Sequence, residues 1–251
     1  MIQVEDFFLP SNTISSIPEE EYEKTGILID SFDAISRMTY KSLYIIDYYK
    51  KNFLYVSDNP LFLCGNSVKE VLKMGYTFYI KHIPQQEQPR LIEINRIGFE
   101  FFNKIPVDEK LDYTISYNFH LINDKKKILI NHNLTPICLN HEGRIWLAAC
   151  LVSLPIQDMT GNIEMRKINE SAIWKYSFRN RCWKKEKGIA INEREQDILS
   201  LSAQGYTMKE IADRICLSLD TIKFYRRKLF EKLEVKNITE AIAFAQNHKL
   251  F

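Results

Sequence analysis

Residues 189–251 carry the start signals of their own helices. Three polar residues are each followed three positions later by Glu, and in a capping box both side chains satisfy backbone N–H groups that a helix start leaves unpaired. The pairs are Asn192 with Glu195, Thr207 with Glu210, and Asn237 with Glu240, and Ser218 with Thr221 has the same spacing. Gly205 can end the first helix in the left-handed conformation. The sequence therefore predicts four helices, over about 193–204, 208–216, 219–233 and 238–247.

The third predicted helix gathers positive charge. Residues 189–251 hold ten Lys or Arg against nine Asp or Glu, but five of the ten cations fall between Lys223 and Lys232. At ~100° per residue, one side of this helix is apolar. The opposite side carries three cations and one aromatic ring: Lys223, Phe224, Arg227 and Lys228. A charge run is often only a solvated face, so the surrounding pattern has to decide its role.

The tight turn Ser-Leu-Asp joins this helix to the one before it and matches a helix-turn-helix. A helix of this width fits the major groove of B-DNA, and the N–H groups at its N-terminus can meet a phosphate. Residues 191–235 resemble the DNA-binding domain of the LuxR/GerE family of bacterial transcription regulators. The residues that carry this resemblance include Glu195, Ile198, Leu199, Gly205, Thr207, Lys209, Glu210, Ile211, Ala212, Ser218, Thr221, Ile222, Lys223, Lys232 and Leu233.

The resemblance implies a role for each matching position. Base contacts are expected from Lys223, Phe224 and Arg227, and contacts to the DNA backbone from Lys209, Ser218, Thr221, Tyr225 and Lys228. Family members often dimerise through the fourth helix, here with Ala241, Ile242 and Phe244. Tyr225 stands where the family usually has histidine, and Phe224 is larger than usual and could contact a thymine methyl.

The clearest strand of the chain lies at 113–121, where large apolar and small polar residues alternate so that the large ones share one face. Two further strands follow in a meander, and an early hairpin and several helices precede it, which predicts an α+β domain. This order resembles a PAS sensory domain over residues 41–155. Ahead of it lies an N-terminal segment with a helix, residues 1–40. After it comes a connector, 156–188, in which residues 163–188 carry a net charge of +5. A basic β-hairpin is expected there, with a helix as the alternative.

The front domain offers several candidate sites. His120 and His132 could face each other across a hairpin, but the five histidines have no metal-ligand spacing, so we expect neither haem nor metal. The aromatic residues Tyr113, Tyr117 and Phe119 could line a ligand cavity, although a filled core is favoured. A phosphorylated receiver would place Asp30 after a strand within repeating βα units, which this pattern lacks.

Other function classes leave no trace in the sequence. It has no G-x-S-x-G, P-loop, G-x-G-x-x-G or H-E-x-x-H motif, and no Trp–Tyr–Asp–Trp arrangement like that of acyl-homoserine-lactone sensors. No apolar run reaches the ~18 residues of a membrane span, and the N-terminus is unlike a secretory signal. The five scattered cysteines indicate free thiols in a reducing compartment. We therefore expect a cytoplasmic protein that is not an enzyme and has no cofactor.

Together these features predict a sequence-specific transcription regulator that binds double-stranded DNA and is expected to act as a homodimer on a two-fold site. The PAS-like domain would sense a signal or mediate dimerisation, with any small-molecule ligand unidentified. The rival hypothesis is a ligand- or protein-binding sensory module whose helical tail docks a protein partner. The sequence leaves open the operator, the sign of regulation, the regulated genes and the dimer interface.

Overall fold

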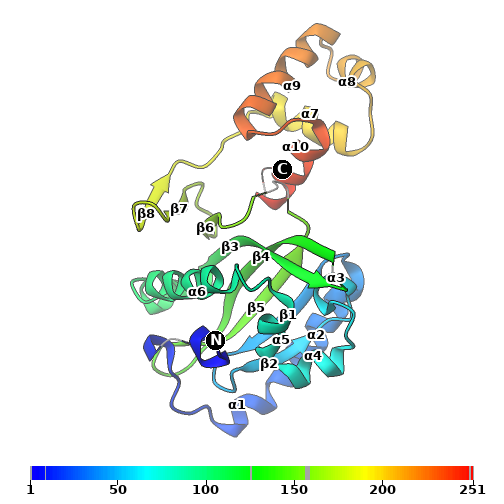
Figure 1. Ribbon diagram of the computed structural model, residues 1–251. Helices are drawn as coiled ribbons and strands as arrows, with labels where there is room; N and C mark the ends of the chain where they lie inside the picture. Colours follow the sequence, from blue (N-terminus) through cyan, green and yellow to red (C-terminus); the bar gives the residue numbers. More distant parts are fainter. Residues whose placement is uncertain (1, 9, 125, 156–158, 249, 251) are drawn as a thin grey trace. The chain divides into compact units, whose positions relative to one another are not determined.

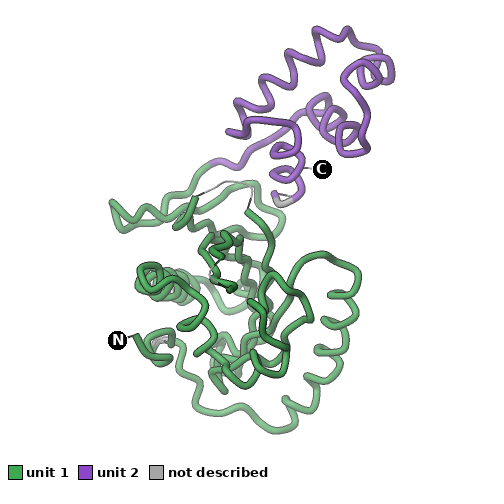
Figure 2. Tube along the Cα trace, turned by 45° about the vertical axis from the view of Figure 1, so that its right-hand side comes forward, with its two compact units in different colours: residues 1–186 green, residues 187–251 purple. Residues whose placement is uncertain are grey.

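The computed structural model describes residues 2–8, 10–124, 126–155, 159–248 and 250 (Figure 1). The chain divides into two compact units, Met1–Glu186 and Lys187–Phe251 (Figure 2). The first unit has a β-sheet with helices packed on it, and the second is all helical, so the described chain is α+β.

The strands of the first unit form one antiparallel sheet, in which the described residues make eight strands in the order β2-β1-β5-β4-β3-β6-β7-β8. Their bounds are β1 Ser42–Asp47, β2 Asn52–Val56, β3 Tyr113–Asn123, β4 Lys126–Leu139, β5 Ile145–Ser153, β6 Ile163–Lys167, β7 Ile173–Ser177 and β8 Cys182–Glu186. The early hairpin and the late meander are confirmed by β1–β2 and by β3–β4–β5.

The helices of the first unit lie before β1 and between β2 and β3. They are α1 Glu19–Glu23, α2 Thr25–Met38, α3 Pro60–Leu63, α4 Val68–Met74, α5 Thr77–His82 and α6 Gln88–Phe102, with short 3-10 turns at Val4–Phe7, Pro10–Asn12 and Val107–Asp112. Asp30 lies within α2 and not after a strand. None of the helices that the structure describes is long and apolar enough to cross a membrane.

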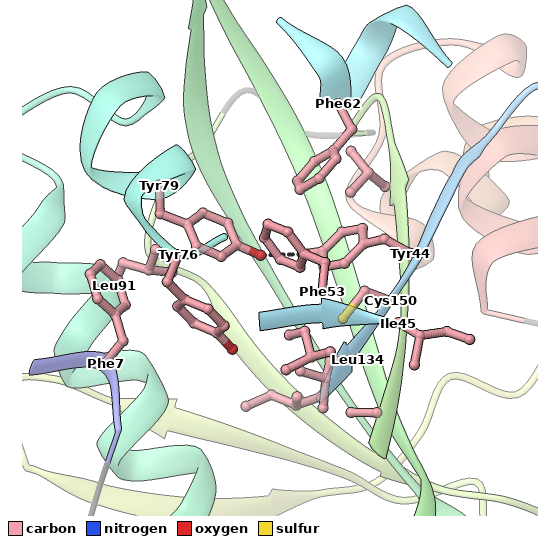
Figure 3. Packing of buried hydrophobic residues seen from close by; sticks show 14 of the residues in the cluster. Phe7, Tyr44, Ile45, Phe53, Phe62, Tyr76, Tyr79, Leu91, Leu134 and Cys150 are labelled. Carbon is pink, nitrogen blue, oxygen red and sulfur yellow. Dashed lines mark hydrogen bonds between the residues drawn. The ribbon is translucent and has the colours of Figure 1, made fainter. Parts of the chain in front are cut away.

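Aromatic side chains fill the core between the sheet and the helices (Figure 3). The Tyr44 and Phe62 rings stack with centroids 4.2 Å apart, and the Tyr44 and Tyr79 hydroxyls share a hydrogen bond of 2.5 Å. Gly98 lets α6 approach the sheet, because a Cβ there would lie 3.0 Å from Ile115 Cδ1. Tyr117 and Phe119 are buried and Tyr113 is half-buried, so all three pack in or against the core.

The two histidines that could have faced each other across a hairpin do not. In the β3–β4 register His120 lies opposite Leu129, whereas His132 lies opposite Tyr117. The two residues belong to different faces of the sheet, because the register places His132 with the odd-numbered large residues of β3. His120 is paired with Glu87, with Nδ1 and Oε1 2.8 Å apart. Over the described residues, no group of three His, Cys, Asp or Glu could hold a metal ion.

The basic hairpin predicted in residues 156–188 is present as β7–β8, but it is not a free connector. Strand β6, which was not predicted, pairs with both β3 and β7 and joins the hairpin to the main sheet. The signal for β6 was available, because Ile163 and Met165 are buried and alternate with polar neighbours. Residues 156–158, at the start of that segment, lie outside the described residues.

The second unit consists of α7 Glu193–Ala203, α8 Met208–Arg214, α9 Leu219–Leu233 and α10 Ile238–Asn247. The predicted N-caps are confirmed: Asn192, Thr207, Ser218 and Asn237 each accept a hydrogen bond from the backbone N–H three residues on. Gly205 has the predicted positive φ, of 90°. Helix α8 ends two residues earlier than predicted, and Cys216 just beyond it has a left-handed φ of 53°.

Candidate nucleic-acid interface

Helix α9 is held in place by an apolar stripe that the core of the second unit buries. Ile222 and Leu229 are fully buried, and Leu233 is nearly so. Ile222 packs with Ile198, Ile211 and Ala212 of the two preceding helices. Because these side chains fix the rotation of α9 about its axis, the opposite side of the helix is turned to solvent.

That opposite side carries the residues predicted to contact bases. Lys223 and Arg227 are exposed, and the Phe224 side chain is 43% exposed although it is a large apolar group. Two cations flank its ring: Lys228 Nζ lies 4.6 Å and the Arg227 guanidinium carbon 5.9 Å from the ring centroid. Lys223 Nζ is 3.0 Å from Asp220 Oδ1, an exposed pair one turn away that is worth little in water.

The residues predicted to contact the DNA backbone lie in four places. Ser218 and Thr221 lie at the N-terminus of α9, where the Thr221 N–H donates to Ser218 Oγ at 3.1 Å. Lys209 is exposed in the first turn of α8, and Lys228 is exposed beside Phe224. Tyr225 is half-buried and packs on the core of the second unit. Tyr225 thus has a packing role, which sequence reasoning missed.

An open hollow of about 420 Å³ lies beside these cations. Its lining comes from the start of α8, from α9 and from the residues after α9: Met208, Lys223, Arg226, Arg227, Phe230, Glu231 and Val235. Arg226 is half-buried and its guanidinium carbon lies 5.6 Å from the Phe230 ring centroid. Burial lowers the pKa of Arg226 from its ordinary value. A packing role for Arg226 therefore agrees with its surroundings.

The structure gives Lys232 and Glu195 a structural role that sequence reasoning did not find. Lys232 Nζ donates to Glu195 Oε1 at 2.8 Å and Oε2 at 2.6 Å, and to the Ala190 carbonyl at 3.2 Å. Glu195 is only 3% exposed, so its charge is neutralised within the unit. Lys232 therefore holds α9 against α7, unlike the exposed cations of α9.

The fourth helix offers less of a dimer surface than the family resemblance implied. Helix α10 packs on α7 and α9, and Ala241 and Phe244 are buried in the single chain. Only Ile242 of the three named residues is half-buried, because the other two face the interior. A dimer that used α10 would therefore need other residues of this helix.

A small cavity is present among the described residues of the first unit. A cavity of about 20 Å³, enough for one water molecule, lies between α6 and the sheet. It is lined mainly by aromatic and aliphatic side chains, among them Tyr48, Ile94, Phe99, Ile115 and Tyr117. Tyr113, Tyr117 and Phe119 pack in or against the core here, which agrees with the filled core that the sequence favoured.

Residues 191–245 match a family model described as bacterial regulatory proteins, luxR family. The C-terminal unit thus contains a LuxR-type helix-turn-helix domain. Curated relatives include the response regulator protein VraR of Staphylococcus aureus and of Staphylococcus epidermidis. Each is 38% identical over 74 residues, which make up 29% of this chain and 35% of the relative. The chain spans about a third of the length of these relatives.

Two solved structures cover most of the chain at low similarity. The Vibrio cholerae VqmA dimer without target DNA is 13% identical, with 88% of both chains covered and a TM-score of 0.35. A phage VqmA–DPO complex is 15% identical, with 90% of this chain and 89% of that chain covered and a TM-score of 0.32. Likenesses this distant assign neither a ligand nor a mode of DNA binding to this chain.

Proposed function

We propose that this protein is a sequence-specific DNA-binding transcription regulator. The single observation that carries the proposal is the exposed face of α9 within a domain of the LuxR type. A solvated charge run would explain the cations alone. It would not explain an exposed phenylalanine between two of them, on a helix joined to its predecessor by a tight turn.

In the proposed mechanism, phosphate contacts supply affinity and base contacts supply choice of sequence. Lys209, Ser218, Thr221, Tyr225 and Lys228 would contact the backbone. Lys223 and Arg227 would donate to base edges in the major groove, and Phe224 would meet a thymine methyl. One helix-turn-helix makes few base contacts, so a homodimer on a two-fold site is part of the proposal.

The first unit is proposed to be a PAS-like domain, residues 41–155, that senses a signal or mediates dimerisation. The order of its elements supports this: two strands, short helices, a longer helix and three strands, with β5 central among them. A signal would act by changing the spacing of two reading helices or the formation of the dimer. The protein is proposed to work in the cytoplasm, without catalysis and without a cofactor.

We expect Lys223→Ala and Arg227→Ala each to weaken specific DNA binding by about 1–3 kcal/mol, because each removes a donor to a base edge. The operator would first be selected from a random pool of duplexes, and affinity would then be measured by fluorescence anisotropy. Lys236→Ala is the matched control, since Lys236 is an exposed cation of the same unit outside α9. Operator affinity equal to wild type in both α9 variants would exclude this assignment.

A protein-docking tail is the rival function, and salt separates the two. When a protein binds duplex DNA, its cations displace counterions from the phosphates. Added salt opposes this release, so the affinity of a DNA binder for duplex falls steeply as the salt concentration rises. A tail that docks a protein need not bind duplex at any ionic strength.

A further inference from the structure

The β7–β8 hairpin has one face committed to packing. Phe101 of α6 lies against both of its tryptophans, with ring centroids 5.6 Å from Trp174 and 4.9 Å from Trp183. At the turn, the Arg90 guanidinium carbon lies 3.8 Å from the Phe178 ring centroid. These contacts fix the hairpin on the first unit and decide which of its faces remains exposed.

The other face and the turn are strongly basic. Lys175 and Lys184 are directly opposite each other in the strand register, and both are exposed. Like charges placed directly opposite destabilise a strand pair. Glu186 offsets Lys175, with Oε2 and Nζ 3.1 Å apart, and the turn adds Arg179 and Arg181, both exposed.

Much of this charge has no carboxylate partner among the residues that the structure describes. Considering only the residues that the structure describes, Arg179, Arg181 and Lys184 have no carboxylate within the 4.0 Å that defines an ion pair. The same is true of Lys187, just beyond β8. Aromatic packing holds the hairpin in place, so Arg179, Arg181 and Lys184 form a positively charged cluster at a fixed position on the first unit. A polyanion would relieve their mutual repulsion.

Duplex DNA is the polyanion that the chain itself indicates. Only residues 187–192 join β8 to α7, the first helix of the LuxR-type unit. Six residues span at most about 21 Å, so the chain itself ties the hairpin to the unit that is proposed to hold the duplex. An acidic protein would need a surface matched to the hairpin, whereas phosphates recur along any duplex.

We propose that Arg179, Arg181 and Lys184 form a second, sequence-independent DNA contact. They would neutralise backbone phosphates beside the site that α9 reads. The inference rests on the proposed function, because it presumes that a duplex is bound. It adds that the first unit takes part in DNA binding directly and not only by positioning the second.

The test uses the full chain with Arg179, Arg181 and Lys184 all replaced by Gln. The slope of log affinity against log salt is negative. Its magnitude decreases by about 0.9 for each phosphate that the protein no longer neutralises, so the variant's slope should be smaller in magnitude by about 2–3. The probes are random-sequence duplexes of about two and about four helical turns, and the decrease in affinity should be larger on the longer one. Preference for the operator over a scrambled duplex should stay within about twofold of wild type.

A second triple variant supplies the matched control. Lys41, Lys69 and Lys73 are exposed on the first unit away from the hairpin, and replacing them by Gln removes the same charge. Fluorescence of Trp174 and Trp183, which pack from the hairpin onto Phe101, reports whether the hairpin variant is folded. A hairpin variant that is folded and has the salt slope of the control would overturn the inference. If wild type does not prefer its selected operator over a scrambled duplex, the proposed function fails instead.

Discussion

Replacing Glu195 by Ala is expected to destabilise the C-terminal unit by about 2–4 kcal/mol. Removing one partner of a buried ion pair typically costs about 3–5 kcal/mol, because the other charge stays buried without compensation. We expect about 2–4 kcal/mol and not the full 3–5 kcal/mol, because the Lys232 side chain is 35% exposed and can be partly rehydrated. The variant also loses the hydrogen bond from the Asn192 N–H to Glu195 Oε2, which caps the start of α7.

Glu195→Gln, Lys232→Met and the double variant complete a cycle that isolates the ion pair. Glutamine can still accept from the Asn192 N–H, so Glu195→Gln tests the charge and spares the cap. Lys232→Met leaves a buried carboxylate without its cation, whereas the double variant leaves no charge at all. The double variant should therefore be more stable than Lys232→Met alone.

All three tryptophans lie in the first unit, so their fluorescence does not report on the second. Amide hydrogen exchange of peptides from residues 187–251 measures the free energy of opening of the second unit itself. For a unit of this size, about 2–4 kcal/mol corresponds to a fall in Tm of roughly 10–30 °C. Unchanged exchange in Glu195→Ala would show that the pair contributes nothing to stability.

The starts of the C-terminal helices could be predicted from sequence because their determinants are local. Asn192, Thr207, Ser218 and Asn237 each act on a backbone group only three residues away. The apolar stripe of α9 depends on helical periodicity alone and placed the exposed face correctly. What these residues contact outside the chain remains a prediction.

Features that join distant segments were not accessible in this way. Glu195 and Lys232 lie 37 positions apart, and nothing in their spacing indicates an ion pair. Strand register is equally non-local: alternation showed that β3 has a large-residue face, but not which residue of β4 lies opposite Tyr117. The misplacement of His120 and His132 follows from that gap, since a shift of one residue turns every side chain to the other face.

Strand β6 and helix α10 show a second limit of the sequence: residue types do not show which surfaces packing leaves exposed. Charge counting identified residues 163–188 as basic, yet only pairing with β3 shows that β6 extends the main sheet. The family resemblance pointed to α10, but it could not show that Ala241 and Phe244 face inward here. In both cases the residue types were readable from the chain, and packing decided what those residues are free to do.

Acid is expected to destabilise the first unit through His132. This side chain is buried, and burial lowers its pKa from the usual 6.5 to about 3, because the charged imidazolium loses its hydration. Its Nε2 lies 2.5 Å from the Tyr44 hydroxyl, and within the described chain its Nδ1 has no hydrogen-bond partner. These two nitrogens therefore find no anion among the described residues that would compensate a proton on the ring.

The direction follows from proton binding in the two states. Between pH 6.5 and about 3 the unfolded chain binds a proton at this histidine and the folded chain does not. Stability therefore falls as pH falls through this window, by about 1.4 kcal/mol for each pH unit. By pH 5 the loss should reach about 2 kcal/mol, before most carboxylates begin to protonate.

The measurement is urea unfolding followed by tryptophan fluorescence, which reports on the first unit, at several pH values between 7.5 and about 5. His132→Gln is the decisive comparison, because an amide near the position of Nε2 can still bond Tyr44 but does not bind a proton in this range. The variant should be less stable than wild type near neutral pH and lose less stability on acidification. Subtracting the two curves removes the contribution of His82, whose pKa burial also lowers. Parallel curves would mean that another group carries the acid sensitivity and that His132 can be protonated within the fold.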